Sequence, residues 1–119
     1  ELAGRLQTDT PLYIADLGVY QLILGLSDQE RLIEFCNKSL GRIIDYDLRQ
    51  HADLLQTLEA FFYCHGNLSQ TAERLIVHRN TLLYRMNRIN QIADIDLDRP
   101  ETRLALHLAL TIRRLLNLN

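Results

Sequence analysis

The sequence predicts an all-α fold, a compact helical domain that contains a helix-turn-helix motif with added N-terminal and C-terminal helices. Three observations predict this class. Among 119 residues there are only two prolines and five glycines. Apolar residues recur at spacings of three and four, and no segment alternates apolar and polar residues as a half-buried strand does. The 47% of hydrophobic residues is enough to form a core.

The N-terminal region is expected to supply the first added helices. Asp16 is placed to cap a short helix over residues 17–24. Ser27 and Glu30 have the spacing of a capping box, in which the serine oxygen accepts a first-turn N–H and the glutamate reaches back. We therefore expect a helix over residues 28–39 and a shorter piece over 42–46.

An amphipathic helix is expected from His51 or Ala52 to about His65, where Gly66 ends it. It would be the scaffold for the two helices that follow. The expected organisation is a helical extension over residues 1–50 that packs on a helix-turn-helix domain over residues 51–119, the whole chain being one structural unit.

The most informative segment is 66–92, GNLSQTAERLIVHRNTLLYRMNRINQI, which predicts two short helices with a tight connection. Asn67 and Gln70 have N-cap and N3 spacing, and the small Ala72 permits the two helices to cross closely. Ile76 occupies the turn. Because a β-branched residue resists positive φ, we expect a wider or differently folded turn there.

The second helix of this segment separates a buried stripe from a polar face. At about 100° per residue, Leu82, Met86 and Ile89 share one side, whereas amide and aromatic groups lie opposite and arginines lie at the border. Such groups can bond base edges and phosphates. The polar face and its borders consist of Arg79, Asn80, Thr81, Tyr84, Arg85, Asn87 and Arg88.

Two alternatives remain open for these residues. The polar face is either an ordinary solvent-exposed helix surface or a DNA-binding surface. The absence of acidic residues over 80–92 favours a surface that meets phosphates. Arg85 lies near the buried stripe, so it is either a phosphate contact or the partner of a carboxylate such as Glu59.

A net positive charge is confined to this segment. Residues 67–92 contain four arginines and one acidic residue, whereas residues 1–66 contain five Lys or Arg and ten Asp or Glu. The net charge is −2, which argues against a nonspecific polybasic binder. A local patch of this kind is sufficient to attract duplex DNA.

A last helix is expected over about 99–116, opened by Asp98 and Glu101 at capping-box spacing. Its leucines occupy nearly all sides, so we expect it in the centre of the domain with partial exposure at a dimer contact. A homodimer or higher oligomer is expected because one short helix reads too few bases.

Other function classes receive little support. Cys36 and Cys64 lack metal-binding or redox spacing, so no metal or cofactor is expected. The four histidines share no catalytic arrangement, which argues against an enzyme. Without a membrane span or a signal peptide, the protein is expected to be soluble and cytoplasmic. The chain begins at Glu1 rather than methionine, as expected of a piece of a longer protein.

The run LIVHRNTLLYRMNRI over residues 75–89 resembles the C-terminal helix-turn-helix of the PucR/CdaR family of bacterial transcription regulators, and the motif is also similar to the Fis type. The resemblance covers most of the chain. It implies a DNA-binding output domain of a regulator, usually an activator of a catabolic operon, whose effector binds a region outside this chain. By position in the motif, it implies DNA contacts from His78, Arg79, Asn80, Thr81, Tyr84 and Arg85, with Ser69 and Gln70 near phosphates.

One alternative function belongs to a different class. A helical protein-protein interaction or signalling module without DNA affinity would place the same basic patch against an acidic partner.

Overall fold

The structure, a computed structural model, describes residues 18, 21–23, 25 and 28–117. Residues 18, 21–23 and 25 are helical, and the remainder of the predicted helix over 17–24 lies outside the described residues. No strand occurs in the described part, so the all-α prediction is confirmed. Its main helices are α3 (Gln29–Gln50), α4 (Leu54–Tyr63), α5 (Leu68–Leu75), α6 (Arg79–Ala93) and α7 (Pro100–Leu115).

Helix α3 differs from the prediction at its start and in its length. Asp28 is the N-cap, and its carboxylate accepts a hydrogen bond from the Arg31 N–H at 2.9 Å, so the assignment of the cap to Ser27 was wrong. The helix passes through Gly41 without a break and joins the two predicted pieces. Leu40 and Ile43 beside the glycine are fully buried. Burial of each side chain contributes about 1.5–3 kcal/mol, which exceeds the roughly 1 kcal/mol cost of a helical glycine.

The start of α4 is capped by a side chain from α3. Asp53 occupies the N-cap position in a left-handed conformation and makes no side-chain cap bond. Instead, the carboxylate of Asp47 accepts hydrogen bonds from the N–H groups of Leu54 at 2.8 Å and Leu55 at 2.9 Å. Helix α4 therefore begins at Leu54, after the predicted start, and Asp47 fixes the angle at which it leaves α3.

The cap of α5 agrees with the prediction, whereas the turn after it does not. The Asn67 side chain accepts a hydrogen bond from the Gln70 N–H at 2.9 Å. Ile76 adopts the left-handed conformation itself, with φ of 56°, and the Val77 N–H bonds the Ala72 carbonyl at 3.0 Å. These bonds close a tight helix end. The expectation of a wider turn was wrong: Ile76 takes the left-handed conformation despite its branched side chain, which is 91% exposed.

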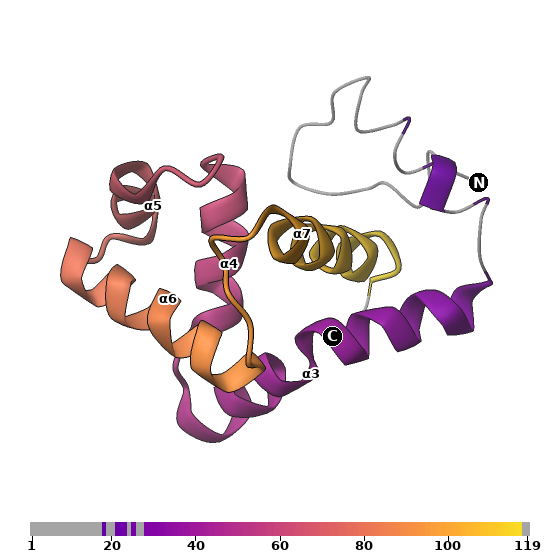
Figure 1. Ribbon diagram of the computed structural model, residues 1–119, viewed down its shortest axis with the longest axis horizontal. Helices are drawn as coiled ribbons and strands as arrows, with labels where there is room; N and C mark the ends of the chain where they lie inside the picture. The colour runs from indigo at the N-terminus through magenta and orange to yellow at the C-terminus, as the bar shows by residue number, and fades with distance from the viewer. Residues whose placement is uncertain (1–17, 19–20, 24, 26–27, 118–119) are drawn as a thin grey trace.

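Helix α7 packs against α3 and α4, and α4 lies between α7 and the pair formed by α5 and α6 (Figure 1). Leu106, Ala109, Ile112 and Leu115 are its buried residues. Leu104, by contrast, is 70% exposed. The helix is therefore largely internal, as predicted, with an exposed strip at its N-terminal end.

The start of α7 does not form the predicted capping box. Arg99 occupies the N-cap position without a side-chain cap bond, and Pro100 follows it inside the helix. Glu101 pairs with Arg99 at 2.9 Å rather than reaching back to Asp98. Since proline already fixes the backbone of the first turn, the helix begins here without a capping side chain.

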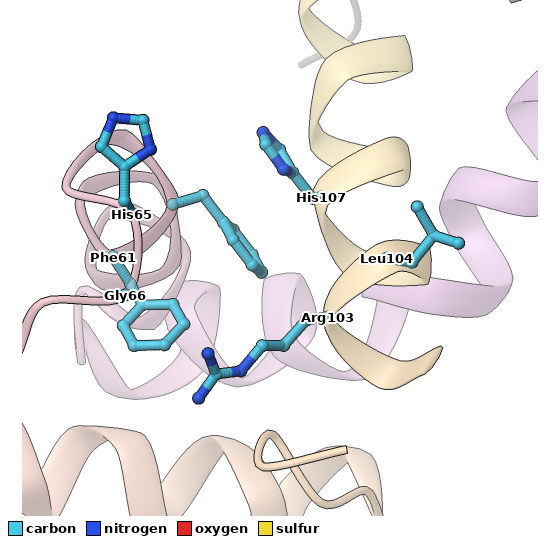
Figure 2. Close-up of a pocket in the computed structure, with 7 residues that line it drawn as sticks. Phe61, His65, Gly66, Arg103, Leu104 and His107 are labelled. Atoms are coloured by element: carbon cyan, nitrogen blue, oxygen red, sulfur yellow. The ribbon is translucent and has the colours of Figure 1, made fainter. Parts of the chain in front are cut away.

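A shallow pocket lies between the end of α4 and the first half of α7 (Figure 2). The Phe62 ring stacks on His107 with centroids 4.7 Å apart. Arg103 donates from Nε to the Leu97 carbonyl at 2.6 Å, and its guanidinium lies 5.1 Å from the Phe61 ring. No lining residue comes from α5 or α6. These contacts join α7 to α4 and to the connection that follows α6.

Within the described part of the chain, no helix is long and apolar enough to cross a membrane. The described residues also contain no group of three or more His, Cys, Asp or Glu side chains that could hold a metal ion. Cys36 and Cys64 are both free and buried.

Candidate nucleic-acid interface

Helix α6 is held in the domain by one buried stripe. Leu82 and Ile89 are fully buried and Met86 is 9% exposed, as the helical projection predicted. These three side chains belong to the core cluster that also includes Leu40 and Leu58. The stripe therefore fixes which side of α6 faces outward.

The outward side of α6 carries hydrogen-bonding and cationic groups and no carboxylate. Tyr84 is 65% exposed. The Arg79 side chain makes no hydrogen bond or ion pair within the described part of the chain. The helix N-terminus adds the positive end of its dipole at the same place. The predicted residues that are exposed on α6 are Arg79, Asn80, Thr81, Tyr84 and Asn87.

Ser69 and Gln70 lie in the first turn of α5, and both are exposed. Figure 1 shows α5 beside α6 at one end of the molecule. The first-turn N–H groups of a helix favour an anion such as a phosphate oxygen. The two helices thus bring the predicted residues of both to the same part of the molecule.

His78 has a structural role in addition to its predicted contact. Its Nδ1 accepts a hydrogen bond from the Asn80 N–H at 3.0 Å, which caps the N-terminus of α6. The neutral ring that accepts at Nδ1 carries its proton on Nε2. His78 therefore caps the start of α6 and keeps its second ring nitrogen as a donor.

Arg85 is half-buried and turns toward α4. Its Nη1 donates to the Thr57 hydroxyl at 3.4 Å, and Thr57 in turn donates to the Asp53 carbonyl at 2.7 Å. Arg85 makes no ion pair with Glu59, although both residues lie in the described part of the chain. The cation of Arg85 therefore remains without a carboxylate partner in that part of the chain.

Arg88 is bound to a residue that the sequence did not single out. Its Nε donates to the Tyr46 hydroxyl at 3.1 Å, and its Nη1 donates to Gln91 at 3.1 Å. The hydrogen bond to Tyr46 raises the pKa of the Arg88 guanidinium, which stays charged. Tyr46 lies 42 residues away along the chain, so no local pattern reveals the pairing.

Arg74 is a further cation that the sequence reasoning did not assign to the site. Its guanidinium carbon lies 3.7 Å from the centroid of the Tyr63 ring, which belongs to α4. Both residues are exposed. The only signal in the sequence was the count of four arginines over residues 67–92. Three of the four, Arg74, Arg85 and Arg88, contact aromatic or hydroxyl groups of neighbouring helices.

Comparison with known proteins identifies the domain. Residues 54–112, from the start of α4 into α7, match the family described as the PucR C-terminal helix-turn-helix domain. The chain is 32% identical over 101 residues to the DNA-binding transcriptional activator AdeR of Bacillus subtilis, covering 85% of this chain and 24% of that protein. It is 32% identical over 114 residues to the proline-responsive transcriptional activator PutR of the same organism, covering 96% of this chain and 28% of that protein.

A third relative comes from another bacterium. The chain is 41% identical over 59 residues to the carbohydrate diacid regulator of Escherichia coli, covering 50% of this chain and 15% of that protein. This chain thus spans about a quarter or less of the length of these relatives. No solved structure matches it.

The match covers the scaffold helix α4, the helix pair α5 and α6, and most of α7. The exposed face described above lies within the matched residues. The family assignment favours DNA binding over the alternative of an interaction module without DNA affinity, and the family consists of transcription regulators rather than enzymes. The chain belongs to the PucR/CdaR family of transcription regulators, and it contains their DNA-binding helix-turn-helix domain.

Proposed function

We propose that this chain is the sequence-specific DNA-binding output domain of a bacterial regulator that activates a catabolic operon. The observation that carries the proposal is the outward face of α6, where Arg79, Asn80, Tyr84 and Asn87 are exposed and no carboxylate is present. Arginine can bond guanine and asparagine can bond adenine in the major groove, each through two hydrogen bonds.

The predicted contacts divide into two kinds. Arg79, Asn80, Tyr84 and Asn87 lie on the outward face, where they would meet base edges. The remaining predicted residues would contact phosphates from the borders and from α5, which orients the domain without reading sequence. These are Ser69, Gln70, His78, Thr81, Arg85 and Arg88.

Activation and the catabolic target are supported by the names of relatives. Two relatives are described as transcriptional activators, one of them proline-responsive, and another as the purine catabolism regulatory protein of Bacillus subtilis. In this proposal the effector is bound by a region outside this chain. In the same proposal, helix α3 of the extension over residues 1–50 braces the domain of residues 51–119; the support for this is that Leu40 and Ile43 of α3 share a core cluster with α4 and α6.

The proposal includes binding as a homodimer. One α6 helix reaches only a few base pairs, so a second copy on a neighbouring half-site supplies the remaining specificity. The exposed strip of α7 around Leu104 is available for such a contact. Sedimentation of the chain with a duplex that contains two half-sites is expected to show two protein copies, and one copy at every concentration would contradict the dimer.

The function is tested by titrating labelled duplex DNA at several salt concentrations with matched variants. Arg79→Ala is expected to lower affinity by about 1–3 kcal/mol, the scale of a two-bond contact to a base. Arg31→Ala is the matched control, because this exposed arginine lies in the first turn of α3, away from α6.

The salt dependence of the same titration separates phosphate contacts from other binding. Affinity is expected to fall steeply as salt rises, since each neutralised phosphate adds about 0.9 to the slope of log affinity against log salt. An affinity independent of salt would contradict the proposal. Equal affinities for wild type and a variant carrying both Arg79→Ala and Tyr84→Ala would contradict it as well.

A further inference from the structure

Leu83 is an apolar residue in an otherwise polar part of the α6 surface. Its side chain is 41% exposed, and it belongs to neither hydrophobic cluster of the described residues. The neighbouring residue Leu82, by contrast, is fully buried. Packing inside the domain therefore leaves a substantial part of the Leu83 side chain uncovered.

The position of Leu83 follows from helix geometry. Arg79 and Asn87 lie four residues before and after it on α6, so the three side chains follow one another along the same side of the helix. At a rise of about 1.5 Å per residue, each neighbour is about 6 Å away along the axis. This distance corresponds to roughly two base-pair steps of about 3.4 Å. When Arg79 and Asn87 contact bases, Leu83 faces the base pairs between them.

The chemistry of leucine restricts what it can meet there. It has no hydrogen-bonding group, so an N–H or oxygen that it covered would lose its partner. In the major groove the base edges offer one apolar group, the C5-methyl of thymine. We infer that Leu83 is a specificity-determining residue that contacts a thymine methyl, and that the operator has an A·T pair between the bases contacted by Arg79 and Asn87. This inference rests on the proposed DNA-reading role of α6.

Replacement of thymine by deoxyuridine tests the contact, because it removes the methyl group and leaves the base pairing unchanged. A duplex that the wild-type chain binds is first selected from a random library. Each thymine is then replaced in turn. At one position per half-site, wild type is expected to bind the deoxyuridine duplex about fourfold more weakly, the factor that corresponds to burial of one methyl group.

Two variants of Leu83 and one control complete the test. Leu83→Ala is expected to bind the thymine and deoxyuridine duplexes equally at that position, whereas Leu83→Met keeps the preference because its side chain remains apolar and long. Leu48→Ala removes an exposed leucine from α3 and is expected to retain the full preference. Circular dichroism of each variant verifies that it is folded.

The outcomes distinguish this inference from the proposed function. If wild type binds DNA in an Arg79-dependent way but no thymine methyl affects its affinity, the inference on Leu83 is wrong and the proposed function stands. The same holds if Leu83→Ala keeps the wild-type preference. If wild type shows no salt-dependent DNA binding, both the proposed function and the inference fail.

Discussion

Arg88 on α6 and Tyr46 on α3 are joined by a hydrogen bond of 3.1 Å between the guanidinium Nε and the phenol oxygen. The guanidinium carbon also lies 5.3 Å from the centroid of the same ring. Since Arg88 lies in the second half of α6, the pair links α6 to the long helix α3. Tyr46 is therefore placed to orient α6, although it does not lie on α6 itself.

Tyr46→Phe removes the hydroxyl and keeps the ring. We expect DNA affinity to fall about threefold, the effect of one modest hydrogen bond, because Arg88 and the second half of α6 become less fixed. Tyr63→Phe is the matched control, since its ring meets Arg74 without a hydroxyl bond among the described contacts. Fluorescence anisotropy with labelled duplex measures both. Equal affinity of Tyr46→Phe and wild type would show that the pair does not position the helix.

Asp47→Ala removes both hydrogen bonds that cap α4 from α3. We expect the free energy of unfolding to fall by about 1–2 kcal/mol, the cost of losing a capping side chain. Asp45→Ala, at an exposed position of the same helix, is expected to stay within about 0.5 kcal/mol of wild type. Urea unfolding followed by circular dichroism compares the two, and similar losses in both variants would rule out the capping role.

The sequence could predict features that depend on spacing within one helix, but not contacts between helices. The buried stripe of Leu82, Met86 and Ile89 and the Asn67 cap depend on spacing within one helix, and both predictions are confirmed. Asp47 and Tyr46 act on other helices, and their partners depend on how those helices pack. No spacing rule contains that information.

The helix boundaries that were wrong also have physical causes. The two pieces predicted on either side of Gly41 form one helix, because the burial of Leu40 and Ile43 contributes more free energy than a glycine inside a helix costs. Ile76 was expected to distort the turn, but its side chain points into solvent and the helix end closes around it. Of the predicted site, the exposure of the α6 face could be derived from periodicity, whereas the Thr57 partner of Arg85 could not.

Ile76→Gly tests the cost of the left-handed residue in the turn. Glycine adopts positive φ without the steric penalty of a branched side chain, so we expect the free energy of unfolding to rise by about 1 kcal/mol. Ile76→Asn should give an intermediate gain, because asparagine tolerates this conformation better than isoleucine. Thermal melting of the three proteins ranks them, and a lower melting temperature for the glycine variant would be contrary to the account.

Because of Cys36, the free energy of unfolding is expected to depend on pH in the alkaline range. Burial raises the pKa of its thiol, an effect that Arg113 partly offsets. The folded state therefore favours the neutral thiol, whose stabilising contribution is complete below the ordinary thiol pKa of about 8.5 and is lost as pH rises through the folded value. We expect the stability difference between wild type and Cys36→Ala to shrink above about pH 8.5 in urea unfolding. A difference that stays constant to high pH would contradict this prediction.

The central claim is that the outward face of α6 reads base sequence. A selection of bound duplexes from a random library, performed in parallel with wild type, Arg79→Ala and Arg31→Ala, tests it most directly. We predict that wild type and Arg31→Ala enrich the same motif, with two half-sites about 10 base pairs apart, and that Arg79→Ala loses the preference at one position of each half-site. Enrichment of no motif by wild type, or of an unchanged motif by Arg79→Ala, would contradict the claim.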